Sequence, residues 1–342
     1  MPKLYRSLLA ETYGVFLATL LILLSIILSF RLANLLSSAS RGDIALGAIL
    51  QLLGLQGLRF LILLAPVAFV LAAMMTLGRW QRDLETTALL ASGLGYGSQL
   101  RALLLAALPL GAVLLYLQLG LLPGVYASQE ALQKKAQQEA GLMFVQPRSF
   151  RSFGSDGVIY IDGLHQNQLE DFFLQQGDEV LLAARGRLEI NDEERLFYLD
   201  NGRRLSLDPE RQSYGQFQRA ELSIPLSQKP QSNRLRTIAT ADLDDSPAQR
   251  AELQLRLNGA LALLFFVPYL PLLARSRVRG GKYQKVLPTF IAFAGYYNLL
   301  EFLVSQMKKG KLPLLASPAL HLLVLVGAGL YWQLGTRKPA HA

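Results

Sequence analysis

The sequence predicts an α-helical membrane protein with an all-β domain inserted between its third and fourth spans. Three observations support this fold class. Hydrophobic residues make up 51% of the chain, charged residues only 17%, and the apolar residues gather in separate long runs. The mean hydropathy is +0.28. Such a composition is typical of membrane proteins and excludes an ordinary soluble enzyme.

Six apolar runs have the length that a helix needs to cross a bilayer, and only the fifth is interrupted, by Glu301. In order they are Tyr13–Phe30, Phe60–Gly78, Ala102–Gln129, Leu257–Ala274, Val286–Met307 and Leu312–Thr336. The first run is too long for a signal peptide and no small-residue cleavage motif follows it, so we expect a retained helix. The predicted domains are therefore residues 1–125 (spans 1 to 3), 126–249 (the insert with its linkers) and 250–342 (spans 4 to 6).

The basic residues of the short loops predict the topology. If the N-terminus is cytoplasmic, the cytoplasmic loops carry twelve Lys and Arg residues and the outer loops carry six, namely Arg31, Arg41, Arg59, Lys308, Lys309 and Lys311. The positive-inside rule then places both termini in the cytoplasm and the insert outside. This distribution explains the net charge of +9 better than a nucleic-acid surface does.

The insert is predicted to form short antiparallel strands, as in a sandwich or jelly roll. Strand-forming stretches are Val158–Ile161, Glu179–Ala184, Gly186–Ile190, Leu196–Leu199, Arg203–Leu207 and Gln216–Ile224. Asp200-Asn201-Gly202 predicts a type I′ hairpin turn, and Asn191-Asp192 a further turn. The polar stretch Tyr126–Ala140 should extend the third span as a helix. Lys229–Asp245 is predicted to be a linker to the fourth span.

Motifs for catalysis are missing from the sequence. It contains no P-loop, so we expect no ATP hydrolysis by this chain. There is no cysteine and there are only three histidines, which makes a metal site improbable. The sequence thus predicts a non-catalytic protein that binds no cofactor.

The segment Gly78–Gly95 predicts a short amphipathic helix from Asp83 to Ala91 in a cytoplasmic loop, with Glu85 exposed near its start. A helix across such a loop is how a permease can dock onto a motor subunit. An ordinary interfacial helix explains the pattern equally well.

Several stretches, in this order and spacing, are similar to one known family. They are RGDIALGAILQLLGL (41–55), MTLGRWQRDLETTALLASGL (75–94), RAELQLRL (250–257), LP (287–288) and KGKLP (309–313). The chain resembles the lipopolysaccharide export permeases of the LptF/LptG (YjgP/YjgQ) family over nearly its whole length. These stretches look more like the LptF type than the LptG type.

The resemblance implies a subunit of an ABC transporter in the inner membrane of Gram-negative bacteria. Such a subunit pairs with LptG, and an LptB dimer hydrolyses ATP for both. The transporter extracts lipopolysaccharide from the membrane and passes it through the periplasmic β-jelly roll to LptC. Membrane lipids surround the complex, and no nucleic acid is involved.

The resemblance also implies roles for particular residues. Lipopolysaccharide contacts are expected from Arg31, Lys308, Lys309, Lys311, Ile159 and Ile161, and coupling to the ATPase from Arg82, Asp83 and Glu85. The lipid-contact residues also have simpler structural explanations. The arginine could snorkel at the interface, the lysines could face anionic phospholipid, and the isoleucines could fill a β core.

Other polar residues in or beside the spans have structural explanations. For Glu301 and Asn298 we favour an interhelical hydrogen bond over a cavity lining. Glu252 and Arg256 have the i, i+4 spacing of a helical ion pair, which we favour over a role in coupling the β domain to the membrane. His321 should face another helix.

Two other function classes remain open. The chain could be a membrane-anchored β-domain scaffold that recruits periplasmic partners, or an ABC permease of the lipoprotein-releasing type. The latter has four spans with its insert after the first, so the three-plus-three pattern argues against it.

Overall fold

The computed structural model describes residues 2–40, 44–144, 148, 150–153, 157–165, 168–190, 194–206, 213–225, 234–275 and 284–337. The chain divides into two compact units. The membrane unit comprises Met1–Leu28, Gln56–Ala127 and Asn233–Ala342, and the β unit comprises Ser29–Leu55 and Ser128–Ser232. Three long helices contribute residues to both units.

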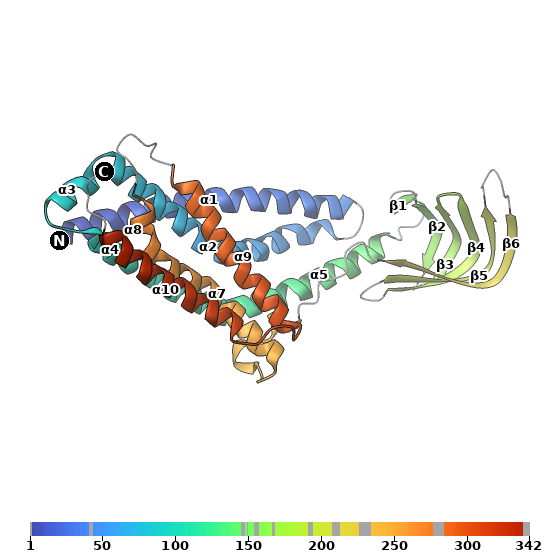
Figure 1. The fold of residues 1–342 in the computed structure, drawn as a ribbon. Helices are drawn as coiled ribbons and strands as arrows, with labels where there is room; N and C mark the ends of the chain where they lie inside the picture. Colours follow the sequence, from blue (N-terminus) through green and yellow to red (C-terminus); the bar gives the residue numbers. More distant parts are fainter. Residues whose placement is uncertain are drawn as a thin grey trace. The chain divides into compact units, whose positions relative to one another are not determined.

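The described α-helices are α1 (Pro2–Ser40), α2 (Ile49–Arg82), α3 (Glu85–Ala91), α4 (Tyr96–Tyr116), α5 (Leu122–Phe144), α6 (Arg234–Thr237), α7 (Pro247–Phe266), α8 (Leu270–Leu273), α9 (Val286–Lys308) and α10 (Ala316–Arg337) (Figure 1). Short 3₁₀ turns lie at Leu46–Ala48, Thr240–Asp242 and Val267–Tyr269, and a π-helical turn at Leu117–Leu121.

Among the described residues, six helical segments are long and apolar enough to cross a membrane, which confirms the predicted spans. They are Arg6–Ser40, Leu46–Arg82, Tyr96–Ala136, Pro247–Leu273, Val286–Lys308 and Ala316–Leu334. The third continues through the π-helical turn into α5, so the predicted polar extension of this span is also confirmed.

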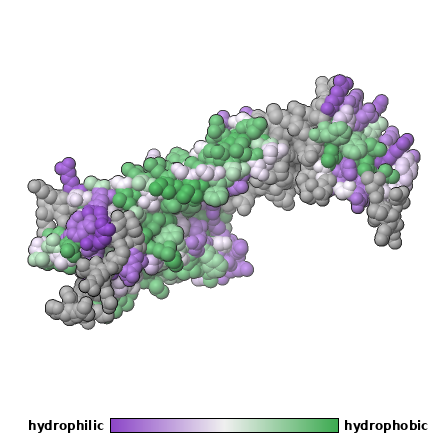
Figure 2. All heavy atoms as spheres, turned by 90° about the horizontal axis from the view of Figure 1, so that it is seen from above, coloured by the Kyte–Doolittle hydropathy of each residue, from purple (hydrophilic) through white to green (hydrophobic). Residues whose placement is uncertain are grey.

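The helices of the membrane unit are apolar both inside and outside. Trp80, Phe69 and Phe293 are buried in its core, whereas Ile22 and Leu323 are 62% and 68% exposed. Hydrophobic residues also dominate the visible surface of the helices in Figure 2. Exposed apolar surface on helices whose backbone groups bond internally is what a bilayer requires.

The core of the membrane unit also holds a small polar network. The Tyr296 hydroxyl bonds to Nδ1 of His321, whose Nε2 lies 3.1 Å from Oδ1 of Asn258. Ser317 donates to the same oxygen at 3.0 Å. His321 therefore faces neighbouring helices, as predicted, and its ring nitrogens are satisfied where burial would make them costly.

The β unit contains one antiparallel sheet in sequence order, β1-β2-β3-β4-β5-β6. Its strands are β1 (Arg151–Phe153), β2 (Gly157–His165), β3 (Gln168–Gln176), β4 (Glu179–Ile190), β5 (Glu194–Ser206) and β6 (Ser213–Pro225). Figure 1 shows these strands curving. The predicted fold class, a helical membrane protein with a β domain inserted after the third span, is confirmed.

The predicted hairpin turn at Asp200-Asn201-Gly202 is wrong, because β5 runs through it. Asn201 has φ +54° and Asp171 in β3 has φ +48°. Both residues belong to a row of residues that crosses the sheet from β2 to β6, and no member of this row pairs with a residue of an adjacent strand. The row comprises Asp162, Asp171, Ala184, Asn201 and Gln218. The backbone conformation that suits a turn instead interrupts the strand pairing along this row, which we call the crease.

The crease shifts the alternation of side chains by one residue. Along β4, Leu181 and Ala183 face the core on the N-terminal side of the crease. On its C-terminal side, Gly186 and Leu188 face the core. The two strands predicted at Glu179–Ala184 and Gly186–Ile190 are therefore one strand. The Asn191-Asp192 turn lies outside the described residues.

Alanine at Gly202 is expected to destabilise the sheet by about 1–3 kcal/mol, because its Cβ would lie 2.5 Å from the Leu182 carbonyl oxygen and overlap the Phe217 ring. Thermal unfolding and limited proteolysis of the full-length protein measure this effect. Gly215→Ala is the matched control, since nothing lies within 4 Å of a Cβ there. Equal effects of the two substitutions would contradict the close approach.

Candidate functional site

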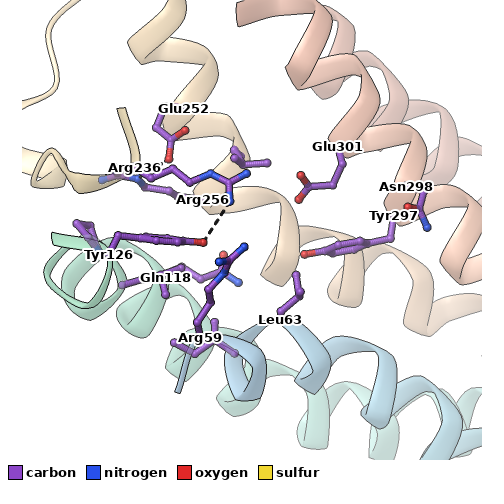
Figure 3. A pocket seen from close by; sticks show the side chains of 14 residues that line it. Arg59, Leu63, Gln118, Tyr126, Arg236, Glu252, Arg256, Tyr297, Asn298 and Glu301 are labelled. Atoms are coloured by element: carbon purple, nitrogen blue, oxygen red, sulfur yellow. Dashed lines mark hydrogen bonds and ion pairs between the residues drawn. The ribbon is translucent and has the colours of Figure 1, made fainter. Parts of the chain in front are cut away.

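The membrane unit contains an open cavity of about 300 Å³, lined by both charged and apolar side chains, between α2, the α4–α5 junction, α6, α7 and α9 (Figure 3). Its charged and polar lining is Arg59, Gln118, Tyr126, Arg236, Glu252, Arg256, Tyr297, Asn298 and Glu301. Ionisable groups gathered among membrane-spanning helices normally mark a binding or transport path.

Two arginines share one aromatic ring on one side of the cavity. The guanidinium of Arg59 lies 5.1 Å from the centre of the Tyr126 ring, and that of Arg236 lies 5.6 Å from it. Arg236 also donates from Nη1 to the Tyr126 hydroxyl at 3.3 Å. Cation–π contacts of this kind hold both guanidinium groups without neutralising their charge.

A buried ion network forms another wall. Arg256 donates to Glu252 at 3.3 Å, and Lys308 at the end of α9 donates to the second oxygen of the same carboxylate. The side chains of Arg256 and Glu252 are only 4% and 2% exposed. The predicted pair is confirmed, but it is part of a three-residue network that links α7 to α9.

Arg256 also holds the chain that returns from the β unit. Its guanidinium donates to Thr240 Oγ1 at 2.7 Å and to the carbonyls of Leu235 and Ile238 at 3.0 and 2.8 Å. Thr240 in turn donates to the Leu119 carbonyl in the π-helical turn. The described part of the predicted linker is therefore a connector of defined structure, residues 234–242, fixed to the helices.

Glu301 and Asn298 line the cavity. The interhelical hydrogen bond expected here is not observed, because the Asn298 amide donates to Ala294 of its own helix at 2.8 Å. Glu301 is half-buried and points into the cavity in Figure 3. It forms no ion pair with any residue that the structure describes.

A second charged cluster lies where α1, α2 and α3 meet. Arg79 binds both carboxylate oxygens of Glu11, with Nη2 2.6 Å from Oε2, and Trp80 donates to Glu11 at 2.8 Å. The same guanidinium reaches Glu85 at 2.8 Å and Asp83 at 3.1 Å. One arginine thus joins three segments through charge-assisted hydrogen bonds.

A helix is present in the predicted loop as α3, Glu85–Ala91, which begins two residues later than predicted and ends before Gly93 at φ +83°. Glu85 was expected to be exposed, and its side chain is 41% exposed yet pairs with Arg79. Arg82 pairs with Asp83 at 3.2 Å, and this hydrogen bond lowers the pKa of the Asp83 carboxyl.

The residues predicted to contact lipid lie in different settings. Arg31 is exposed on α1. Lys309 and Lys311 are exposed after α9, whereas Lys308 is engaged by Glu252. Ile159 and Ile161 are 1% and 2% exposed within the β core, so they face its interior.

The sequence did not single out Glu11, Arg79, Tyr126 or Arg236 as site residues, and Arg59 entered only the count of loop charges. A signal existed for Arg59, which belongs to the small group of basic residues predicted outside. No spacing relates Arg59 to Arg236, because the fold alone brings them to one ring.

Six candidate spans in the described part of the chain, a cavity with charged lining residues among them and an inserted antiparallel β domain define a multi-pass membrane protein. Residues 6–334 match the family described as lipopolysaccharide export system permease LptF/LptG, and the chain belongs to this family. Family membership and the six apolar helices together indicate a multi-pass protein of the inner membrane.

Similar proteins occur in Escherichia coli K12 and Shigella flexneri. Each is described as lipopolysaccharide export system permease protein LptF and is 24% identical over 321 residues. The match covers 90% of this chain and 88% of each relative. The matched length therefore includes both the spans and the β insert.

Proposed function

We propose that this chain is an LptF-type permease subunit that exports lipopolysaccharide as one half of a transporter completed by LptG. One observation carries the proposal: the family match runs from residue 6 to residue 334, through all six spans and the inserted β domain in order. A scaffold protein would not need a charged cavity inside its helices.

In this proposal an LptB dimer hydrolyses ATP, and the chain itself binds no cofactor. Both termini and α3 face the cytoplasm, so α3 docks on the ATPase through Arg82, Asp83 and Glu85. The charged cluster around Arg79 supports this role because it ties α3 to α1 and α2.

The lipid route starts at cations near the outer membrane edge and ends in the β domain. Arg31, Lys309 and Lys311 are exposed and suited to lipid phosphates, whereas Lys308 must first leave Glu252. Acyl chains would then pass along the β interior at Ile159 and Ile161 toward LptC. Because these isoleucines are buried, the β core must open to admit a chain.

Site-specific photo-crosslinking in vesicles that contain the whole transporter tests this route. A photoreactive residue at Arg31 should form lipopolysaccharide adducts without ATP, and one at Ile161 only with ATP. Leu182 is the matched control, because it lies in the same sheet but is 41% exposed. We expect no ATP-dependent adduct there.

The two function classes give different results in this experiment. A permease subunit gives ATP-dependent adducts at Ile161 above the Leu182 background. A scaffold protein gives no adduct at Arg31 or Ile161 although the complex is intact, and this result would overturn the proposal.

A further inference from the structure

The cavity places opposite charges on two of its sides. Arg59 and Arg236 lie together at the Tyr126 ring, and Glu301 points in from α9 (Figure 3). None of these three forms an ion pair with another residue in the described ranges of the chain. Arg256 and Lys308, by contrast, share the carboxylate of Glu252 in the wall.

Buried polar atoms in the lining also lack partners. Nε of Arg236 and Oε1 of Gln118 are buried and make no hydrogen bond. Gln118 as a whole is only 6% exposed. Unsatisfied buried groups are costly, so a polar ligand or water in the cavity is needed to complete them.

The size and opening of the cavity restrict that ligand. About 300 Å³ lies at the lower end of small-molecule pockets and suits a head group rather than a whole lipid. Exposed Leu63 and Asn298 form part of the lining, so the cavity is reachable from the surface of the helices. Apolar Leu63 is suited to the start of an acyl chain.

We propose that this cavity binds a zwitterionic phosphoethanolamine head group. The phosphodiester lies against the guanidinium groups of Arg59 and Arg236, and the primary ammonium donates to the carboxylate of Glu301. Arginine suits phosphate because its planar fork matches two phosphate oxygens. The inference concerns a lipid bound within one subunit and does not depend on which lipid is exported.

Two other lipid head groups test separately the phosphate contact with the arginines and the ammonium contact with Glu301. Phosphatidylglycerol keeps the phosphate but has no amine for Glu301. Phosphatidylcholine keeps the zwitterion, but its quaternary ammonium has no N–H to donate. A site that binds the phosphate, the positive charge and the ammonium hydrogens therefore prefers phosphatidylethanolamine to phosphatidylglycerol and phosphatidylcholine.

The test is native mass spectrometry of the full-length protein released from nanodiscs with equal parts of phosphatidylethanolamine, phosphatidylglycerol and phosphatidylcholine. The wild-type protein should retain one phosphatidylethanolamine in preference to the other two. Glu301→Gln should lower the preference over phosphatidylglycerol roughly tenfold, the factor that one charge-assisted hydrogen bond supplies. Arg236→Gln should weaken retention of all three lipids.

Arg250→Gln is the matched control, because Arg250 pairs with Asp245 at the surface and does not line the cavity. Thermal unfolding of each variant shows whether it is folded. Soluble glycerophosphoethanolamine, added separately, should displace the retained lipid if the head group is what binds.

Three outcomes would overturn the proposal: an unchanged lipid preference in folded Glu301→Gln, no displacement by glycerophosphoethanolamine, or retention of lipopolysaccharide in place of phosphatidylethanolamine with no effect of Glu301→Gln. A tenfold loss of preference in Glu301→Gln, together with displacement by the soluble head group, would support it.

Discussion

Replacing Arg256 by alanine is expected to lower the free energy of unfolding by about 3–5 kcal/mol, the cost of breaking a buried ion pair. Glu252 would remain 2% exposed with Lys308 as its remaining cation. Thr240 and the carbonyls of Leu235 and Ile238 would lose their donor at the same time. Thermal unfolding in detergent measures the loss.

Arg250→Ala is the control, because Arg250 lies on the same helix but pairs at the surface. Its side chain is 52% exposed and that of its partner Asp245 is 93% exposed, so its removal should cost at most about 1 kcal/mol. Arg256→Lys should recover only part of the loss, since one ammonium cannot reach four acceptors on two segments. If Arg256→Ala and Arg250→Ala unfolded alike, the network would not stabilise the connector.

The spans could be predicted because a bilayer imposes one simple requirement, an uninterrupted apolar helix of sufficient length. Four of the six predicted runs lie wholly inside such a helix, while Leu257–Ala274 extends one residue beyond its helical segment and Leu312–Thr336 begins four residues before α10. The extension of the third span was also predictable, since the polar stretch after it consists of good helix formers. These features are local in sequence, so composition and periodicity reveal them.

The sheet shows where a local signal fails. Asp-Asn-Gly favours positive φ, and Asn201 does adopt φ +54°. Two neighbouring strands nevertheless pair with β5 on both sides of this residue, and the ladder bonds extend the strand through it. The local conformation was predictable, but its consequence depends on partners that are distant in sequence.

The charged clusters could be predicted least. Glu252 and Arg256 are one helical turn apart, and their pair follows from spacing. Lys308, which shares Glu252, comes from a different helix, and Glu11 lies 68 residues from Arg79. No sequence period encodes such distances. For this reason Glu85 was predicted to be an exposed contact for a partner protein, and its ion pair with Arg79 was not predicted.

The pairing of Glu85 leads to the second large prediction, which rests on the proposed function. In the complete transporter, Arg79→Ala is expected to lower the lipopolysaccharide released per ATP hydrolysed by about tenfold or more. Arg79 joins Glu85 of α3 to Glu11 of α1, and losing a bidentate charge-assisted contact of this kind costs about 1.5–3 kcal/mol. Transport and ATP hydrolysis are measured in the same vesicles.

Arg101→Ala is the matched control, because this arginine is exposed on α4 and forms no ion pair with any residue that the structure describes. Arg79→Ala should leave the ATPase bound, whereas Glu85→Ala should weaken both its binding and transport. This difference separates a residue that docks the motor from one that transmits its movement. Equal transport per ATP in Arg79→Ala and Arg101→Ala would contradict the role of Arg79.

A double-mutant cycle decides whether Glu11 and Arg79 act as one unit. If their contact carries the movement of α3 to α1, Glu11→Gln in the Arg79→Ala background should cause no further loss of transport per ATP. Additive losses would mean that each residue acts through other partners, such as Trp80 for Glu11. Because the ratio of transport to hydrolysis is measured, a uniform loss of folded protein cannot imitate the expected result.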